Sequence, residues 1–300
     1  PTTNHTAALL QGGRVLVVGG TDFTNGAAPD AELFDPAGAG SWSTTGAPLA
    51  ARMNHALAVL QDGTALLIGG ESPVNVPVAT CERWSPATGQ WTATGSMSTP
   101  RSRFAAATLR DGKVLACGGL ASLGASRLGS CELYSPGPGT WAPVGSLITA
   151  RSYPSLTELP DGRVLAAGGD VSSGYVGLSE VLDYLGSRTW SPVGSLSSPR
   201  AFFSTTLLPS GLVLAAGGFT GSAILASAQV FDPSTNLWSA APSMANQRNM
   251  HSATMLPSGR VLVAGGNPGS VPTELYEPAS PSMTAVTPSS QPRAGHTATL

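Results

Sequence analysis

The side chains best suited to chemistry in this sequence recur at fixed intervals. All four histidines, His5, His55, His251 and His296, occupy one position of a repeating pattern, and three of them stand three residues after an arginine. Imidazole is a common ligand for zinc and copper, and His251, His5 and His55 would converge on one metal ion if their repeats were neighbours in a closed arrangement. No carboxylate or thiolate accompanies them. Local hydrogen bonding within a strand is therefore the favoured interpretation, and no cofactor is predicted.

Side chains that could bind a ligand occupy two adjacent positions, two and three residues after the repeated arginine. In chain order these pairs are Asn4 and His5, Asn54 and His55, Arg103 and Phe104, Tyr153 and Pro154, Phe202 and Phe203, Met250 and His251, Gly295 and His296. From them we predict a binding site and assign no catalytic residue. The predicted site consists of His5, Asn54, His55, Arg103, Phe104, Tyr153, Phe202, Met250 and His251.

Other chemistries lack their usual sequence signals. The chain has no G-x-S-x-G elbow, no H-E-x-x-H motif and no glycine motif that would cradle a phosphate before a helix. The formal charge is −2, from 15 basic and 17 acidic residues without a run of either sign. This balance predicts no nucleic-acid partner. No apolar run approaches about 18 residues, so we expect no membrane insertion.

The three cysteines lack the C-x-x-C spacing of metal sites. Cys81 and Cys131 occupy the same position in successive repeats. Cys117 and Cys131 could face each other on neighbouring strands, but buried free thiols are the favoured interpretation.

The elements that position these residues follow a period of about 50 residues, which is typical of propellers and solenoids. An apolar run ends on a glycine pair six times, at Gly19 and Gly20, Gly69 and Gly70, Gly118 and Gly119, Gly168 and Gly169, Gly217 and Gly218, and Gly265 and Gly266. We predict repeats at about 3–52, 53–101, 102–151, 152–200, 201–248 and 249–293, within one domain that spans residues 1–300. Residues 294–300 form a surplus first strand. We expect the N-terminal copy, 4–10, to be innermost in the first blade, and the C-terminal copy to be peripheral or to begin a further blade.

Each repeat contains four segments with strand character. An alternating segment such as HALAVL and a turn such as QDGT indicate a hairpin into the apolar run. A strand with a glutamate and a strand that begins with tryptophan follow, and an arginine closes the repeat. The glutamates are Glu32, Glu82, Glu132, Glu180 and Glu274, with Gln229 in the fifth repeat; the tryptophans are Trp42, Trp91, Trp141, Trp190 and Trp238, with Met283 in the sixth; the arginines are Arg52, Arg101, Arg151, Arg200, Arg248 and Arg293. Four antiparallel strands per repeat predict an all-β, six-bladed propeller.

These shared features resemble the Kelch repeat family over essentially the full length of the chain. The resemblance implies structural roles for the motif residues. We expect the tryptophans to fill each blade next to the glycine pairs, and the arginines to bond carbonyl groups of neighbouring blades. The stretches after the glycine pairs are long and dissimilar, so they mark the loop face, where binding function concentrates. The predicted site lies on this face, around a central channel.

One segment, ARSYPSLTELPDGRVLAAGG, also resembles part of the galactose oxidase propeller. That resemblance implies that Tyr153 stands at the position of a copper-binding tyrosine. The family's cross-linked cysteine is replaced by Phe104, and its later tyrosine–histidine pair by Met250 and His251. We therefore predict that the thioether radical cofactor of that family does not form.

Three functions fit these observations. The first is a binding or scaffold module whose loop face holds a protein or carbohydrate partner. The second is an enzyme similar to galactose oxidase or to the Kelch-type sugar epimerases, with chemistry around Tyr153, Arg103 and the histidines. The third is a structural segment of a longer secreted repeat protein, indicated by the surplus strand. We expect a monomer in an extracellular or periplasmic compartment.

Overall fold

The structure is a computed structural model that describes residues 4–22, 26–27, 30–122, 124, 126–268, 272–286 and 293–298. Every regular element in these ranges is a β-strand. In the same ranges we find no helix that is long and apolar enough to cross a membrane. Apart from its last two residues, the chain divides into two compact units, Pro1–Val144 and Gly145–Ala298.

The first unit contains three antiparallel four-stranded sheets, with strand orders β1-β2-β5-β6, β7-β8-β9-β10 and β11-β12-β13-β14. A two-stranded sheet, β3-β4, lies in the loop that follows the first glycine pair. The strands are β1 Thr6–Leu9, β2 Val15–Val18, β3 Thr21–Asp22, β4 Gly26–Ala27, β5 Ala31–Asp35, β6 Ser41–Thr44, β7 Ala56–Val59, β8 Ala65–Ile68, β9 Cys81–Trp84, β10 Trp91–Thr94, β11 Ala105–Thr108, β12 Val114–Cys117, β13 Cys131–Ser135 and β14 Thr140–Val144.

The second unit repeats this plan, with strand orders β15-β16-β19-β20, β21-β22-β23-β24 and β25-β26-β27-β28 and a small β17-β18 sheet. Its strands are β15 Ser155–Glu158, β16 Val164–Ala167, β17 Asp170–Val171, β18 Gly174–Tyr175, β19 Ser179–Leu182, β20 Trp190–Val193, β21 Ser204–Leu207, β22 Val213–Ala216, β23 Ala228–Asp232, β24 Leu237–Ala241, β25 Ser252–Met255, β26 Val261–Ala264, β27 Thr273–Glu277 and β28 Ser282–Val286.

Each four-stranded sheet is one predicted repeat, so the all-β class and the six blades are confirmed. In the sixth blade Met283 faces Tyr276, as Trp141 faces Tyr134 in the third, so the degenerate repeat is complete. The assignment of the whole chain to one domain stays a prediction.

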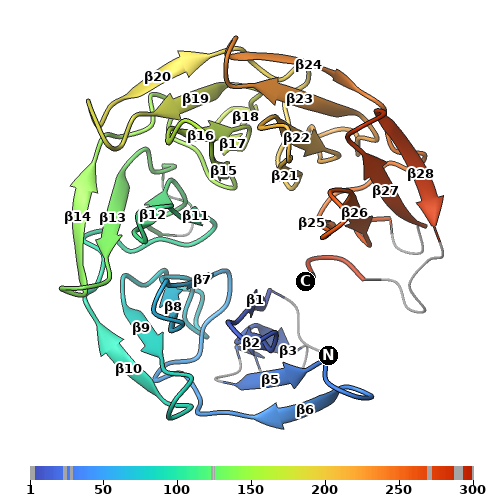
Figure 1. Ribbon diagram of the computed structural model, residues 1–300. Coiled ribbons are helices and arrows are strands. Elements are labelled where there is room, and N and C mark those ends of the chain that lie inside the picture. Colours follow the sequence, from blue (N-terminus) through green and yellow to red (C-terminus); the bar gives the residue numbers. More distant parts are fainter. Residues whose placement is uncertain are drawn as a thin grey trace. The chain divides into compact units, whose positions relative to one another are not determined.

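The apolar runs of the sequence become the second strands, which form the core of each unit. All residues of β8, β12, β16 and β22 are buried. Within each unit the first strands of successive blades are neighbours, β7 with β1 and β11, and β21 with β15 and β25 (Figure 1).

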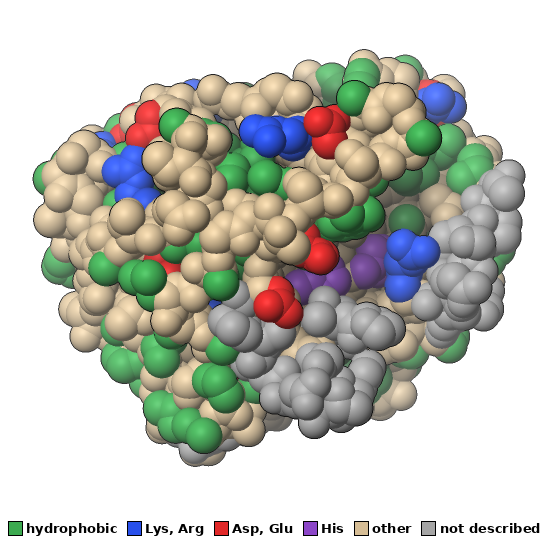
Figure 2. All heavy atoms as spheres, turned by 90° about the horizontal axis from the view of Figure 1, so that it is seen from below, with side chains coloured by type: hydrophobic (Ala, Val, Ile, Leu, Met, Phe, Trp, Pro, Cys, Tyr) green, Lys and Arg blue, Asp and Glu red, His purple; other side chains and the backbone are tan. Residues whose placement is uncertain are grey.

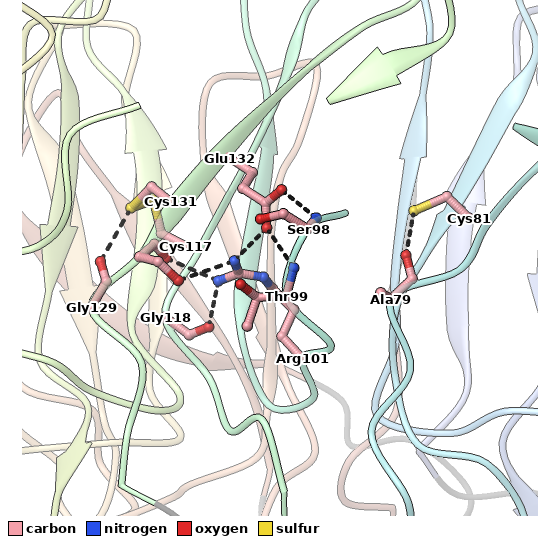
Figure 3. A network of polar contacts seen from close by, with 11 residues as sticks. Ala79, Cys81, Ser98, Thr99, Arg101, Cys117, Gly118, Gly129, Cys131 and Glu132 are labelled. Carbon is pink, nitrogen blue, oxygen red and sulfur yellow. Dashed lines mark hydrogen bonds and ion pairs between the residues drawn. A yellow bond between two sulfur atoms is a disulfide. The ribbon is translucent and has the colours of Figure 1, made fainter. Parts of the chain in front are cut away.

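The repeated arginines join successive blades from a buried position. Arg101 donates from Nη1 to the carbonyl oxygens of Gly118, at 3.0 Å, and Ser130, at 2.9 Å, and from Nη2 to the Glu132 carboxylate, at 2.8 Å (Figure 3). The same carboxylate accepts the Ser98 main-chain N–H at 2.7 Å. The expected arginine-to-carbonyl bonds are thus present, and a buried ion pair accompanies them. The equivalent pairs are Arg52 with Glu82, Arg151 with Glu180, and Arg248 with Glu274.

The expectation that each tryptophan fills its own blade does not hold for Trp91, Trp190 and Trp238. Instead they reach the preceding blade: the indole N–H of Trp91 donates to the Gly46 carbonyl at 2.8 Å, and that of Trp238 to Ser179 Oγ at 3.0 Å. Trp42, in the first blade, is 59% exposed. The indoles of Trp91, Trp190 and Trp238 therefore close contacts between successive blades, a role that the repeat pattern alone does not distinguish from filling one blade.

The interpretation of Cys117 and Cys131 as free thiols is also wrong. They are directly opposed on β12 and β13 and form a disulfide with a Cα–Cα distance of 4.2 Å (Figure 3). Cys81 is the free cysteine of the structure; its opposite residue on β8 is Ile68. Burial raises the pKa of the Cys81 thiol to about 11. The sequence allowed Cys117 and Cys131 to face each other on neighbouring strands, but it did not decide between a disulfide and two free thiols.

The two copies of the first-strand sequence have different places. β1 pairs with β2 as the first strand of the first blade, as predicted. Residues 293–298 lie against the sixth blade, where the Arg293 carbonyl accepts the Gly266 N–H at 2.8 Å, just as the Arg52 carbonyl accepts the Gly20 N–H at 3.1 Å. The C-terminal copy therefore starts as the first strand of a further blade would start. Residues 299 and 300 lie outside the described part of the chain.

Candidate functional site

The first of the two predicted binding positions has a left-handed backbone in every repeat. Such a φ is uncommon for residues other than glycine. Here it recurs because the chain must turn sharply between the closing arginine and the next first strand. The φ values are 59° at Asn4, 52° at Asn54, 54° at Arg103, 51° at Tyr153, 57° at Phe202, 53° at Met250 and 62° at Gly295. Among the described residues all of these except Gly295 place a side chain on the loop face, and none of them is buried.

The second predicted binding position, three residues after the repeated arginine, packs closely against the glycine pair of the preceding blade. A Cβ added at Gly19 would lie 2.8 Å from His55 Cε1, and one added at Gly217 would lie 2.8 Å from His251 Cε1. Phe104 approaches Gly69 in the same way. The first glycine of the pair is therefore required both for its positive φ and for this close contact.

Three of the histidines are bound to hydroxyl groups of the preceding blade. The Nε2 atoms lie 2.7 Å from Thr6 Oγ1 for His55, 2.9 Å from Ser204 Oγ for His251 and 3.0 Å from Ser252 Oγ for His296. Burial, and secondarily the nearby motif arginine, lowers the pKa of His55 and of His251 to about 3. We call these two the inter-blade histidines. They are neutral, and their ring positions are fixed by the fold.

The donors for a metal ion do not come together in the described residues. No group of three His, Cys, Asp or Glu side chains is placed to hold one there. Local hydrogen bonding, the favoured interpretation of the histidines, agrees with the contacts of His55 to Thr6 and of His251 to Ser204.

The residues that the galactose oxidase resemblance singles out do not fit a copper radical site. Phe104 has no sulfur for a thioether and packs against Gly69. Met250 lies where the resemblance calls for a phenol, and its sulfur is 3.9 Å from Asn267 Nδ2. His251 is committed to Ser204. Tyr153 and His251 match residue types of that ligand set, but the thioether sulfur and the second phenol are missing.

Tyr153 instead belongs to an aromatic cluster in the second unit, formed by Tyr153, Tyr175, Phe202 and Phe219. The ring centroids of Tyr153 and Phe202 are 4.4 Å apart, those of Tyr175 and Phe202 6.4 Å, and those of Tyr175 and Phe219 5.6 Å. All four side chains are partly exposed. Tyr175 comes from β18, and Gly221 is required beside it because an added Cβ would lie 3.0 Å from the Tyr175 ring. The cluster offers connected aromatic surface on the loop face.

A polar cluster of Asn54, Glu71 and Arg103 lies on the loop face of the first unit. We call it the Arg103 cluster. Glu71 is 1% exposed; its Oε1 accepts Arg103 Nε at 3.1 Å and its Oε2 accepts Asn54 Nδ2 at 3.0 Å. The Arg103 side chain keeps 32% of its surface exposed. A buried carboxylate thus holds a partly exposed guanidinium in place.

Sequence reasoning missed Tyr175, Glu71 and Phe219. Glu71 and Phe219 directly follow glycine pairs, and each forms a β-bridge with the residue that directly follows an arginine, Met53 and Ala201 respectively. Extending the hairpin register by one pair in every repeat would have identified this position. Tyr175 gives no such signal, because it lies in a loop without a repeat equivalent. Parts of the predicted loops, residues 23–25, 28–29, 123, 125 and 269–271, lie outside the described chain.

One cavity lies at the other end of the strands. Its volume is about 500 Å³, and Pro160, Asp161, Leu212 and Asp232 are among its lining residues. Each carboxylate accepts hydrogen bonds within the turn that contains it. Asp161 accepts the Arg163 N–H, and Asp232 accepts the N–H and hydroxyl of Ser234. We therefore place the candidate site on the loop face instead. Figure 2 shows charged side chains of both signs scattered over one side of the molecule, without a broad patch of either sign among the coloured side chains.

Comparisons with known proteins agree with the prediction of Kelch-like repeats. The Kelch motif model matches residues 204–245. A fungal alcohol oxidase of the AA5 family, solved in complex with copper, is similar in structure with a TM-score of 0.79 and 19% identity, and the match covers 97% of this chain and 66% of the oxidase. The structure of YjhT is similar with a TM-score of 0.74 and 13% identity, covering 96% of this chain and 98% of YjhT. The chain thus spans just under two thirds of the oxidase, and no curated protein matches it in sequence. At these identities the likeness shows the fold, a β-propeller, and together with the Kelch motif match and the six motif repeats it makes the chain similar to Kelch-repeat propellers and, distantly, to the galactose oxidase propeller.

Proposed function

We propose that this chain is a non-catalytic binding module whose loop face holds a carbohydrate. The observation that carries the proposal is the aromatic cluster. Sugar rings present apolar C–H faces, and partly exposed aromatic rings supply large, stiff surfaces that suit such faces. The closest pair in the cluster, Tyr153 and Phe202, is tilted by 54° with centroids 4.4 Å apart.

The frame beneath the cluster supports this function because it fixes the rings before a ligand arrives. Tyr153 and Phe202 each follow a fully buried arginine by two residues, and each takes the left-handed turn of the repeat. Tyr175 is held against the Phe219 ring and beside Gly221. Side chains fixed in this way lose little conformational freedom on binding, which favours affinity.

The test is the binding of neutral galacto-, xylo- and cello-oligosaccharides, measured by affinity electrophoresis and titration calorimetry. We expect at least one series to bind, and Tyr175→Ala to weaken that binding at least tenfold. The matched control is Trp42→Ala, which removes a larger and more exposed aromatic side chain from β6 of the first unit. Binding that Trp42→Ala weakens as much as Tyr175→Ala would contradict the assignment to the aromatic cluster.

Two other functions are tested by related experiments. A protein partner is indicated if no oligosaccharide binds at millimolar concentration while a peptide library yields ligands that depend on Tyr175. An oxidase is indicated if protein supplied with copper releases peroxide from galactose and Tyr153→Phe abolishes the release. Because Phe104 and Met250 do not fit the radical site, we expect no such release.

A further inference from the structure

We propose that the Arg103 cluster binds the carboxylate of a sugar acid such as a uronic acid. This site lies in the first unit, whereas the aromatic cluster lies in the second. The proposal therefore stands on separate residues, and it survives or fails independently of carbohydrate stacking on the aromatic cluster.

The arginine is held in place before a ligand arrives. Glu71 is 1% exposed and takes Arg103 Nε at 3.1 Å. The Glu71 main chain is itself fixed, because its N–H donates to the Met53 carbonyl at 2.8 Å and its carbonyl accepts the Met53 N–H at 3.0 Å. A free surface arginine loses much side-chain freedom when it binds a ligand. Arg103 has already lost most of that freedom in the folded protein.

The fold does not need this ion pair. In the other repeats the residue after the glycine pair, equivalent to Glu71, is Thr21, Leu120, Asp170, Phe219 or Asn267. Arg103 is likewise the single arginine among residues two places after a motif arginine. Every blade is complete without the pair, so its presence in one place indicates a function other than holding the blades together.

The chemistry of the cluster selects a carboxylate that has hydroxyl groups beside it. Guanidinium matches a carboxylate with two parallel N–H donors, and about a third of the Arg103 side chain is exposed to meet one. The amide of Asn54 donates to Glu71 and retains a carbonyl oxygen that can accept from a hydroxyl. Since Glu71 offsets the charge of Arg103, directed hydrogen bonds must supply the affinity, and salt should weaken binding only modestly.

The probes are tri-galacturonate and its fully methyl-esterified form, which share rings and hydroxyls and differ in the free carboxylates. We expect calorimetry to show at least tenfold tighter binding of the free acid. Arg103→Gln should remove that preference. Arg103→Lys should also remove most of it, because lysine keeps the charge but lacks the fork of donors. The control is Lys113→Gln, which removes one positive charge from the same blade at the opposite end of β11.

The variant Glu71→Gln distinguishes a role of Glu71 in holding Arg103 in place from an effect of the net charge of the cluster. This variant makes the cluster more positive, so attraction by net charge alone predicts tighter binding of the acid, whereas a role in holding Arg103 predicts weaker binding. Thermal unfolding curves of all four variants show whether each one folds. Equal binding of the acid and its ester, or an acid preference that persists in Arg103→Gln, overturns the proposal. So does an Arg103-dependent affinity for hexaglutamate that tri-galacturonate lacks, because the ligand would then be an acidic peptide.

Discussion

The fifth blade contains a buried arginine without the carboxylate that its counterparts have, and the substitution Gln229→Glu should supply it. Arg200 is fully buried, and its Nη2 bonds Ser227 Oγ at 3.0 Å. Burial lowers the pKa of Arg200 well below its usual value, to about 10. Since a tenfold change in an ionisation constant corresponds to about 1.4 kcal/mol, burial destabilises the charged guanidinium by roughly 3 kcal/mol.

The introduced carboxylate would find its partners already in place. Gln229 Oε1 accepts the Ser197 N–H at 3.0 Å, as the Glu132 carboxylate accepts the Ser98 N–H in the third blade. Burying a carboxylate has its own desolvation penalty of several kcal/mol, which offsets much of the attraction. We expect a net increase of about 1–2 kcal/mol in the free energy of unfolding at pH 7, within the range of single stabilising substitutions.

Urea unfolding followed by tryptophan fluorescence measures this change. The control is Gln247→Glu, which adds the same charge at an exposed position in the same unit and should have little effect. Arg200 lowers the pKa of the introduced carboxylate, so the gain is present above about pH 4.3 and is lost as the pH falls through the lowered value. If Gln229→Glu lowers the urea midpoint at pH 7 while the control leaves it unchanged, the argument from the repeated ion pairs is refuted.

Four further outcomes are expected. The inter-blade histidines bind fewer protons in the folded than in the unfolded state between about pH 3 and 6.5. Each should therefore lower the free energy of unfolding by up to ~1.4 kcal/mol per pH unit as the pH falls through that window. Thermal unfolding from pH 7.5 to 4.5 measures this loss. Trp141→Ala should cost about 3–5 kcal/mol in urea unfolding, and Trp42→Ala, at the exposed equivalent position, much less; equal costs would contradict the packing between blades. Reducing the Cys117–Cys131 disulfide should lower the free energy of unfolding by about 3 kcal/mol on the chain-entropy model, with a Cys117→Ala/Cys131→Ala variant insensitive to reductant. Deleting residues 294–300 should lower the melting temperature by several degrees, because the Ser252–His296 contact is lost; an unchanged value would show that this segment contributes nothing to the sixth blade.

The repeat made most of the fold predictable. Glycine pairs, hairpin turns and closing arginines mark every blade, and each marker has a local physical cause, such as a positive φ or a close contact. What the pattern did not predict depends on contacts between strands or between blades. Cys117 and Cys131 face each other only because of the register of β12 and β13. Trp91 lies between blades because its indole reaches the Gly46 carbonyl of the preceding linker.

The candidate site was predictable in its position but only partly in its membership. Arg103 and Tyr153 were found because they occupy a repeat position with variable side chains. Glu71 follows a glycine pair at the start of a loop whose sequence differs between repeats, so the repeat pattern did not place it beside Arg103. Tyr175 comes from a loop that differs in every repeat, so no comparison between repeats could identify it.

The same division explains how one frame can carry different sites. The closing arginine, the glycine pair and the residue beneath it form contacts that recur in successive blades, so substitution at these positions is costly. The position two residues after the arginine accepts Asn, Arg, Tyr, Phe or Met with nearly the same φ, so stability places little restriction on its side chain. The side chains at that position and at the residue after the glycine pair can therefore be selected for binding. In the first unit they combine into an ion pair with an amide, and in the second they contribute three of the four rings of the aromatic cluster. Each unit thus presents a different recognition chemistry on the same backbone, and binding assays on the two clusters can be interpreted separately.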